Sequence, residues 1–587
     1  MLKTPDEIVS MANPSLSFSS PLHHGKDEEE VLINAGRRMT VYCPKENKNK
    51  TPHYLMNTQK TRLAAALVLA GTAAVAGAQV YTNVDAYAMP TWHSPYVVEP
   101  ILSAADQVPR TSNPQTSFQM VGIPDGLGIY QVSQYTARIL MNHEFSATAL
   151  SRPVIGESRV KGAFVSSFLI DRQRRGIVSG DLAFTDVHVE STYFGPIARE
   201  DNTTPAFARF CSGAVAGARE GFDRWIYFAG EEAESGTFDP RGGSAVAVFD
   251  GKAHVLPGMG HLPWENLLPM PRVDTGLYAN KTVIMLMEDG PASAPYCGMF
   301  MYVGTKNRKS TNPLERNGLV GGQFYVLRSL DEDYNSEPDF YGEGSAVQCE
   351  WVRIPNAGAK TYEELKNAAV AQDFFRFSRP EDGAWSKTDK FSYYFLTTGG
   401  DTATAPGANK LGRMYQMHMD PANPLGYVTL EVVADADHSV HADLALSPDN
   451  LDTSARYIMI DEDGHANTRP VMAQRKRDGS IWRYDLWDMT AAPVRVAALT
   501  AMGRDGVYAN PGSVTTPATL PGTPTFNTNK YTMTARGIWE TSGVHETSSI
   551  FGDGTFVFDV QAHGPTSAPG DSTVEDGQLL ILIPEDS

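Results

Sequence analysis

Acidic, amide and imidazole side chains recur at the ends of six apolar runs in this chain. The runs are ARILMNHE (137–144), DRWIYFAGEE (223–232), KTVIMLMEDG (281–290), FSYYFLTTGGD (391–401), ARYIMIDEDG (455–464) and GTFVFDVQAH (554–563). Carboxylate and amide oxygens are the ligands that hard divalent cations prefer. Their repeated placement at the ends of similar runs predicts one shared metal-binding centre.

A short polar motif precedes each of these runs. The motifs are IPDG (123–126), CSG (211–213), WEN (264–266), RPED (379–382), SPDN (447–450) and WETS (539–542). The Asp or Asn of any single motif could simply form a turn by bonding to nearby backbone groups. Plain turns have no need of Glu, however, so the set as a whole favours metal ligands.

The elements that must position these side chains are β-strands. Short runs of β-branched and aromatic residues bounded by Gly, Asp and Asn are typical of strands. A repeated β-unit that cannot bury both faces alone indicates radial stacking of sheets. We therefore expect an all-β fold, a six-bladed β-propeller with loop and short helical insertions, and a helix within residues 360–377.

The N-terminal part reads as a leader. Residues 56–78 have the anatomy of a signal peptide, with basic Lys60 and Arg62, an apolar stretch from Leu63 to Val75, and small residues before position 79. The apolar stretch is short for a membrane span. Residues 1–55 are expected to be either a non-native upstream extension from a misplaced start codon or a disordered segment. We expect residues 79–587 to form a single periplasmic or secreted domain with no stable membrane insertion.

Composition narrows the choice of partners. The formal net charge is -19, which argues against nucleic acid, whose phosphates need basic patches, and suits a protein that binds several cations. Beyond the leader the cysteines are Cys211, Cys297 and Cys349. Their odd number leaves at least one thiol unpaired, and a bond between Cys297 and Cys349 stays open.

Two residues offer chemistry besides the oxygen ligands. Cys211 lies in a turn of small residues, where it is either a ligand for a soft or borderline metal or a buried small hydrophobe. Arg379 precedes Pro380 and Glu381, and it either clamps an anion such as phosphate or forms an internal ion pair.

Signatures of other catalytic mechanisms are missing. The sequence has no GxSxG elbow, no HExxH helix, no P-loop and no CxxC pair. The successive turns that hold Asp449, Asn450 and Asp461 instead offer amide and carboxylate oxygens suited to calcium. Catalysis, if present, is expected to be metal-assisted.

The order of these motifs resembles that of the PhoX alkaline phosphatases. CSG at 211–213, GEE at 230–232, RPED, SPDN and GTFVFDVQAH carry the resemblance, which extends from Val121 to His563. It implies a six-bladed propeller that holds iron and calcium ions and hydrolyses phosphomonoesters outside the cytoplasm. It further implies that Arg379 and Glu381 are catalytic and that Arg379 binds phosphate. The implied iron ligands are Cys211, Glu265 and Glu381, and the calcium ligands come from Glu144, Asp449, Asn450, Asp461, Glu540 and Gln561.

Three functions follow as alternatives. The first is a metal-dependent phosphatase acting on a small-molecule phosphate ester. The second is a calcium-dependent propeller hydrolase of other specificity, such as a lactonase or phosphotriesterase. The third is a noncatalytic propeller that uses calcium for stability and binds a partner.

Overall fold

The computed structural model describes residues 79–92, 94–234, 236–290, 295–463, 471–472, 479–499, 539–563 and 573–585. The chain divides into two compact units, residues 1–70 and 71–587, and all described residues belong to the second. The predicted upstream extension and signal peptide lie outside the described residues. In the described part of the chain, no helix has the length and apolarity needed to cross a membrane.

The described strands form five sheets of four or more strands. In the strand orders that follow, strands named next to each other are hydrogen-bonded neighbours in the sheet. The first two are β10 (Ile177–Leu182), β9 (Phe164–Asp171), β6 (Thr136–His143), β5 (Pro124–Gln131); and β12 (Thr192–Pro196), β11 (Phe184–Val189), β16 (Gly251–Val255), β15 (Ala245–Phe249), β14 (Ile226–Glu231), β13 (Phe210–Ala216). The nine-stranded sheet is β17 (Trp264–Pro269), β18 (Lys281–Glu288), β19 (Met299–Thr305), β20 (Gln323–Ser329), β21 (Ala346–Ile354), β25 (Val428–Asp435), β24 (Arg413–His418), β23 (Ser392–Thr397), β22 (Pro380–Trp385). The last two are β1 (Ala88–Pro90), β29 (Val494–Leu499), β28 (Ser480–Asp485), β27 (Tyr457–Glu462), β26 (Pro448–Thr453); and β2 (Tyr96–Ser103), β32 (Asp576–Pro584), β31 (Phe556–Ala562), β30 (Glu540–Glu546).

Small elements complete the described fold. Two further pairs of short strands are β3 (Gln107–Pro109) with β4 (Ser117–Gln119) and β7 (Leu150–Ser151) with β8 (Val160–Lys161). The helical insertions are α2 (Pro313–Arg316), α3 (Tyr362–Val370), α5 (Ser548–Phe551), η1 (Pro257–Met259), η2 (Glu332–Tyr334) and η3 (Ala357–Ala359). The all-β class and the short helical insertions are therefore confirmed.

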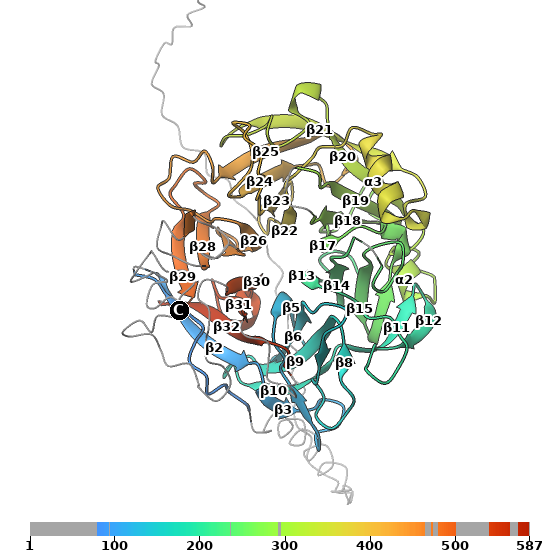
Figure 1. Cartoon of the computed structure of the whole chain (residues 1–587), viewed down its shortest axis with the longest axis vertical. Helices are drawn as coiled ribbons and strands as arrows, with labels where there is room; N and C mark the ends of the chain where they lie inside the picture. Colours follow the sequence, from blue (N-terminus) through green and yellow to red (C-terminus); the bar gives the residue numbers. More distant parts are fainter. Residues whose placement is uncertain are drawn as a thin grey trace, which may run out of the picture. The chain divides into compact units, whose positions relative to one another are not determined.

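Six strands surround a common centre (Figure 1). They are β5, β13, β17, β22, β26 and β30, and each lies at one edge of its sheet or, for β17 and β22, at the two edges of the nine-stranded sheet. Each contacts the next in this order, and β30 contacts β5, so the inner strands close a ring. The six polar motifs lie at the N-terminal ends of these strands, so most of their residues are strand residues and not turns. The first residues of four motifs, Ile123, Arg379, Ser447 and Trp539, each directly precede a strand.

The termini of the described unit hold this ring closed. Strand β2, near the start, pairs antiparallel with β32, the last strand, and β1 pairs with β29. Sheets from the two ends of the chain are thus tied by backbone hydrogen bonds.

The cores lie between neighbouring sheets and between the two halves of the nine-stranded sheet, as the alternation of side chains along each strand requires. On β18, Ile284 and Leu286 join the core shared with β14 and β15. Val283, Met285 and Met287 point to the other side and join the core shared with β23 and β24. A continuous apolar strand is therefore buried on both faces.

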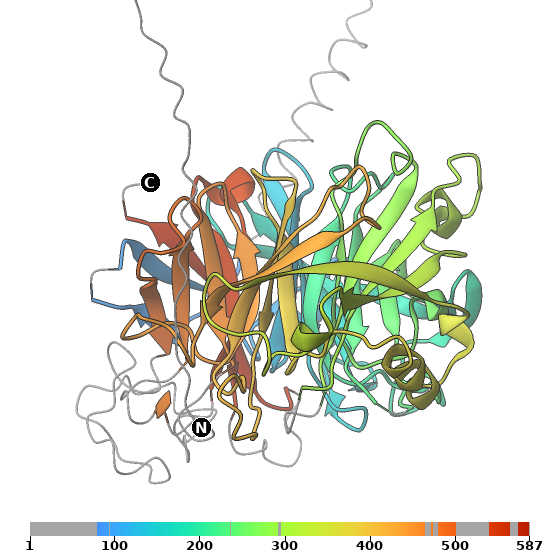
Figure 2. The same ribbon diagram turned by 90° about the horizontal axis from the view of Figure 1, so that it is seen from above.

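The predicted helix is shorter than its sequence window. Helix α3 begins after Thr361, whose side chain accepts from the Glu364 N–H while the Glu364 carboxylate accepts from the Thr361 N–H. This capping box satisfies two terminal donors. The helix ends at Val370, and Figures 1 and 2 show it, in yellow, at the periphery of the strands.

A buried ion pair fastens α3 to the nine-stranded sheet. Lys366 Nζ lies 2.9 Å from Glu288 Oε2 and 2.6 Å from the Tyr296 carbonyl oxygen. Both charged side chains are only 1% exposed. The ammonium also lies 4.0 Å from the centroid of the Tyr296 ring, which adds a cation–π contact.

Lys366→Met is expected to lower the free energy of unfolding by about 3–5 kcal/mol, because it leaves the Glu288 carboxylate buried without its cation. Chemical denaturation measures the change, with the exposed Lys410→Met as control. The double variant with Glu288→Gln should recover part of the loss. A Lys366→Met effect no larger than that of the control would refute the role of the pair.

Candidate metal centre

A bulge occurs in all six inner strands. Each inner strand pairs with the next strand of its sheet, and the register of this pairing shifts by one residue. The shift lies at the N-terminal end of five strands and between Ser542 and His545 in β30. In five of the six, the shift spans the motif residues Asp125, Cys211, Glu265, Glu381 and Asp449. A bulge bends its strand and re-aims a side chain. These bulges therefore place ligand-type side chains from five different strands at one end of the ring.

The backbone that leads into four of these strands is strained. Ile123, Arg209, Arg379 and Ser447 have φ of 45°, 42°, 58° and 48°. Residues other than Gly seldom adopt this left-handed region, and such strain tends to be retained where function requires it.

The bulge residues join two more acids in one cluster. Three groups each bring their ligand atoms within 4.8 Å of one another: Asp125, Glu144, Cys211; Cys211, Glu232, Glu265; and Glu265, Glu381, Asp449. Because Cys211 and Glu265 are shared, the groups are continuous. We call these seven residues the acidic centre.

Hydrogen bonds from neutral groups fix several of these side chains. Ser212 donates to Glu265 Oε1 from its hydroxyl at 2.6 Å and from its backbone N–H at 3.1 Å. Gln561 Nε2 donates to Glu144 Oε2 at 3.0 Å and to Asp125 Oδ2 at 3.3 Å, while Gln561 Oε1 has no hydrogen-bond partner among the described residues. The Cys211 thiol donates to Glu232 Oε2 at 3.2 Å.

Electrostatics make this cluster unfavourable without cations. Burial, and then the neighbouring carboxylates, raise the pKa of Glu232 and of Glu265 to about 8. Burial, followed by the same kind of repulsion, raises the pKa of the Cys211 thiol well above its usual value. Carboxylates suit hard cations, and a thiolate beside them suits a borderline transition metal. The donor set therefore fits a mixed metal centre.

The structure gathers most of the residues that the sequence singled out. Glu144, Cys211, Glu265, Glu381 and Asp449 belong to the acidic centre. Gln561 contacts two of its members, and Asn450 Nδ2 donates to Asp449 Oδ2 at 3.0 Å. Glu540 lies beside it: burial and then Asp463 raise the pKa of Glu540 to about 8, and Glu144 is a further repelling charge.

Asp461 stands apart from these groups. It lies on β27, opposite the bulge of β26, and is fully buried with no hydrogen-bond partner for either carboxylate oxygen in the described structure. Asp559 on β31 is also fully buried, and neither of its carboxylate oxygens has a hydrogen-bond partner among the described residues.

The ligand assignment made from the sequence leaves out Asp125 and Glu232 of the acidic centre and Asp289 beside it. Asp125 occupies the same place in IPDG that Asp449 occupies in SPDN, so the motif alignment could have identified it. Glu232 was noticed only as part of GEE, and Asp289 as part of EDG. Nothing in the sequence separates Glu232 from its neighbour Glu231, which instead accepts hydrogen bonds from the backbone of Ala208 and Ser244.

Arg379 is a cation beside the acidic centre, as is Arg209, whose Nη2 lies 3.1 Å from Glu232 Oε1. Its Nε lies 2.9 Å from Asp289 Oδ1, and its Nη2 lies 2.8 Å from Asp289 Oδ2 and 3.2 Å from Glu381 Oε1. The internal ion pair left open by the sequence is therefore present. Nη1 lies 3.7 Å from Asp463 Oδ2, and the side chain is 22% exposed. Asp289 and Glu381 thus contact the Nε and Nη2 groups of the guanidinium, and the Nη1 group can donate hydrogen bonds to an anion.

The three described cysteines are buried and free, so Cys297 and Cys349 are not bonded.

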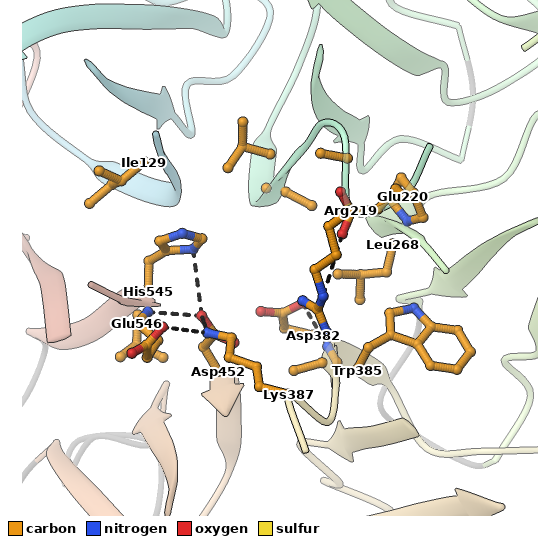
Figure 3. A pocket seen from close by; sticks show the side chains of 18 of the residues that line it. Ile129, Arg219, Glu220, Leu268, Asp382, Trp385, Lys387, Asp452, His545 and Glu546 are labelled. Carbon is orange, nitrogen blue, oxygen red and sulfur yellow. Dashed lines mark hydrogen bonds and ion pairs between the residues drawn. The ribbon is translucent and has the colours of Figure 1, made fainter. Parts of the chain in front are cut away.

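The opposite ends of the inner strands form a pocket of different character (Figure 3). It has a volume of about 260 Å³ and is lined by late residues of all six inner strands. Lys387 Nζ lies 3.1 Å from Asp452 Oδ2 and 2.9 Å from Glu546 Oε2, and Figure 3 shows these side chains facing one another. These acids have a cationic partner, unlike most acids of the acidic centre.

Comparison with known proteins bears on the fold. No family model matches the chain, and no curated protein matches its sequence. Pseudomonas fluorescens PhoX, in a complex with the transition-state analogue vanadate, is similar in structure with a TM-score of 0.55 and 14% sequence identity, over 86% of this chain and 98% of that one.

Two other solved structures align poorly. A luciferin-regenerating enzyme has a TM-score of 0.27 at 11% identity, over 83% of this chain and 95% of its own. A thermostable family-43 glycoside hydrolase has a TM-score of 0.20 at 10% identity, over 54% and 91%. Neither alignment is close enough to indicate a shared fold. The radial sheets and the PhoX alignment together show that this chain has a PhoX-like β-propeller fold.

Proposed function

We propose that this protein is an extracytoplasmic metal-dependent phosphatase that hydrolyses phosphomonoesters. The observation that carries the proposal is the position of Arg379, whose Nη2 lies 3.2 Å from Glu381 at the edge of the acidic centre. A cation cluster beside a guanidinium is the arrangement that a phosphoryl group requires.

The proposal includes six blades. We interpret the nine-stranded sheet as two blades. They form one continuous sheet because the outermost strand of the first blade, β21, pairs with the outermost strand of the second, β25. Its two ends, β17 and β22, are both inner strands, as each blade of a propeller would provide.

The ligand assignment follows the two kinds of donor. We assign iron to Cys211, Glu265 and Glu381, where the thiol lies, and calcium to the oxygen donors in or beside the acidic centre: Glu144, Asp449, Asn450, Glu540 and Gln561. Cations held there would stabilise the negative charge that develops on a phosphoryl group during hydrolysis.

The chain itself binds and orients the ester. Arg379 donates from Nη1 to a phosphoryl oxygen, while Asp289 holds the other edge of the guanidinium with two hydrogen bonds. Asp289 is 3% exposed, so this partner is fixed by the surrounding core. The carboxylates of the acidic centre repel phosphate until bound cations neutralise their negative charge. Substrate binding therefore depends on metal.

Arg379→Lys is expected to lower kcat/KM for a chromogenic phosphomonoester by about 100-fold, because an ammonium cannot reproduce the two-sided contacts of the guanidinium. Steady-state kinetics of protein reconstituted with iron and calcium measures the effect. Arg456→Lys is the matched control, since Arg456 also bonds one carboxylate, Asp485, through Nε and Nη2 but lies exposed. Chelation should abolish the activity.

Other outcomes would select the other functions. Turnover of lactones or phosphotriesters but not of monoesters would favour a calcium-dependent hydrolase of different specificity. Calcium bound without iron, no hydrolysis and no effect of Arg379→Lys would favour a binding propeller.

A further inference from the structure

Two histidines lie side by side far out on one sheet. His188 on β11 and His254 on β16 are register partners on parallel strands, and their ring centroids are 5.2 Å apart at an interplanar angle of 36°. Strands β15 and β14 lie between β16 and the inner strand β13. The pair is therefore separate from the acidic centre.

Both imidazoles are buried yet incompletely bonded. His188 is 8% exposed and His254 5%. Three ring nitrogens have no hydrogen-bond partner among the described residues: Nδ1 and Nε2 of His188, and Nε2 of His254. Buried polar atoms are almost always paired, so three such nitrogens in two adjacent rings indicate a ligand.

The surroundings orient the rings as ligands. His254 Nδ1 lies 2.7 Å from the Glu190 carbonyl oxygen, which can only accept, so Nδ1 carries the proton and Nε2 presents its lone pair. Such a bond to the second nitrogen is typical of metal-binding histidines. Phe249 stacks on His254 at 4.4 Å and Tyr193 packs edge-on to His188 at 5.6 Å, which restricts both rings.

A cavity opens beside the pair. Its volume is about 260 Å³, and its lining includes both histidines, Asp250 and Lys252. Asp250 is paired with Arg224, and Lys252 brings an opposing positive charge. Because the Asp250 carboxylate is already ion-paired, the unbonded nitrogens of the two imidazoles are the donors that decide which ligand fits.

We propose that His188 and His254 form a second metal site, which binds a divalent transition-metal ion such as Zn²⁺ or Ni²⁺. Two imidazoles that share a tetrahedral ion at nitrogen–metal distances of about 2.0–2.1 Å have ring centroids about 5 Å apart, which matches the observed spacing. Imidazole selects zinc, nickel or copper over calcium and magnesium. Water completes the coordination.

The test is Zn²⁺ titration of the full chain by calorimetry, with the protein first loaded with iron and kept in excess calcium so that both kinds of site proposed for the acidic centre are occupied. The wild type is expected to bind one more zinc ion than the His188→Ala/His254→Ala variant. The matched control, His418→Ala, removes an exposed histidine on β24 and should bind like the wild type. Glu381→Gln should also retain the extra ion, which separates this site from the proposed catalytic centre. Equal zinc binding by the wild type and the double variant would overturn the proposal.

A second measurement needs no variant. Anomalous diffraction at the zinc edge from crystals soaked in Zn²⁺ is expected to show a peak between the two rings. Ordered water alone at that position would overturn the proposal.

Discussion

Glu381→Gln is expected to lower kcat/KM for a phosphomonoester by more than about 100-fold. Substituting a residue that only hydrogen-bonds to a metal ligand already lowers metal affinity or activity by about 10- to 100-fold, and Glu381 is itself a proposed ligand. Glu381 is the only member of the acidic centre that both shares a ligand group with Glu265 and Asp449 and lies within 3.2 Å of Arg379. The amide keeps the shape of the side chain but loses its charge. A metal site and an anion clamp are thus weakened by one change.

Two controls separate this loss from misfolding. Glu363→Gln changes an exposed acid of α3 and should leave kinetics unchanged. Elemental analysis of Glu381→Gln should show less iron than the wild type, while the melting temperature in chelator should not fall. Full activity with a normal metal content would remove Glu381 from the mechanism.

The parts of this fold that the sequence predicted are those with a local signal. The runs around Ile284 and Phe558 contain the continuous apolar residues of strands buried on both faces, and their repetition predicted the radial arrangement of sheets. The capping box of Thr361 and Glu364 likewise marks the start of α3. Merging of β21 with β25 has no such signal, because the pairing joins residues far apart in the chain.

The sequence predicted which types of residue form the candidate site, but it did not predict the backbone geometry that brings them together. The motifs identified Cys211, Glu265 and Asp449 because ligand-type residues recur at one place in each unit. That five of the six motifs lie in a β-bulge follows from strand pairing, which sequence periodicity does not show. Asp461 was grouped with Asp449 by composition, whereas the pleat of β27 places it opposite the bulge and outside the ligand groups.

Metal removal should reverse the usual pH dependence of stability for this protein. Burial and like charges raise the pKa values of Glu232, Glu265 and Glu540 to about 8 in the folded chain. In the unfolded chain a Glu titrates near about 4.3. Between these values the folded apoprotein binds more protons than the unfolded chain, so the free energy of unfolding must fall as pH rises.

We therefore expect the melting temperature of chelator-treated protein to decrease steadily from about pH 5 to about pH 8, whereas protein loaded with iron and calcium should show little decrease, because the cations replace the protons. Differential scanning calorimetry at constant ionic strength measures both series. Glu540→Gln should flatten the slope of the apoprotein, since an amide does not titrate, and Glu363→Gln should not. A melting temperature of the apoprotein that is constant or rises with pH would mean that these carboxylates are already neutralised by groups of the chain, and the acidic centre would then have no electrostatic need for metal.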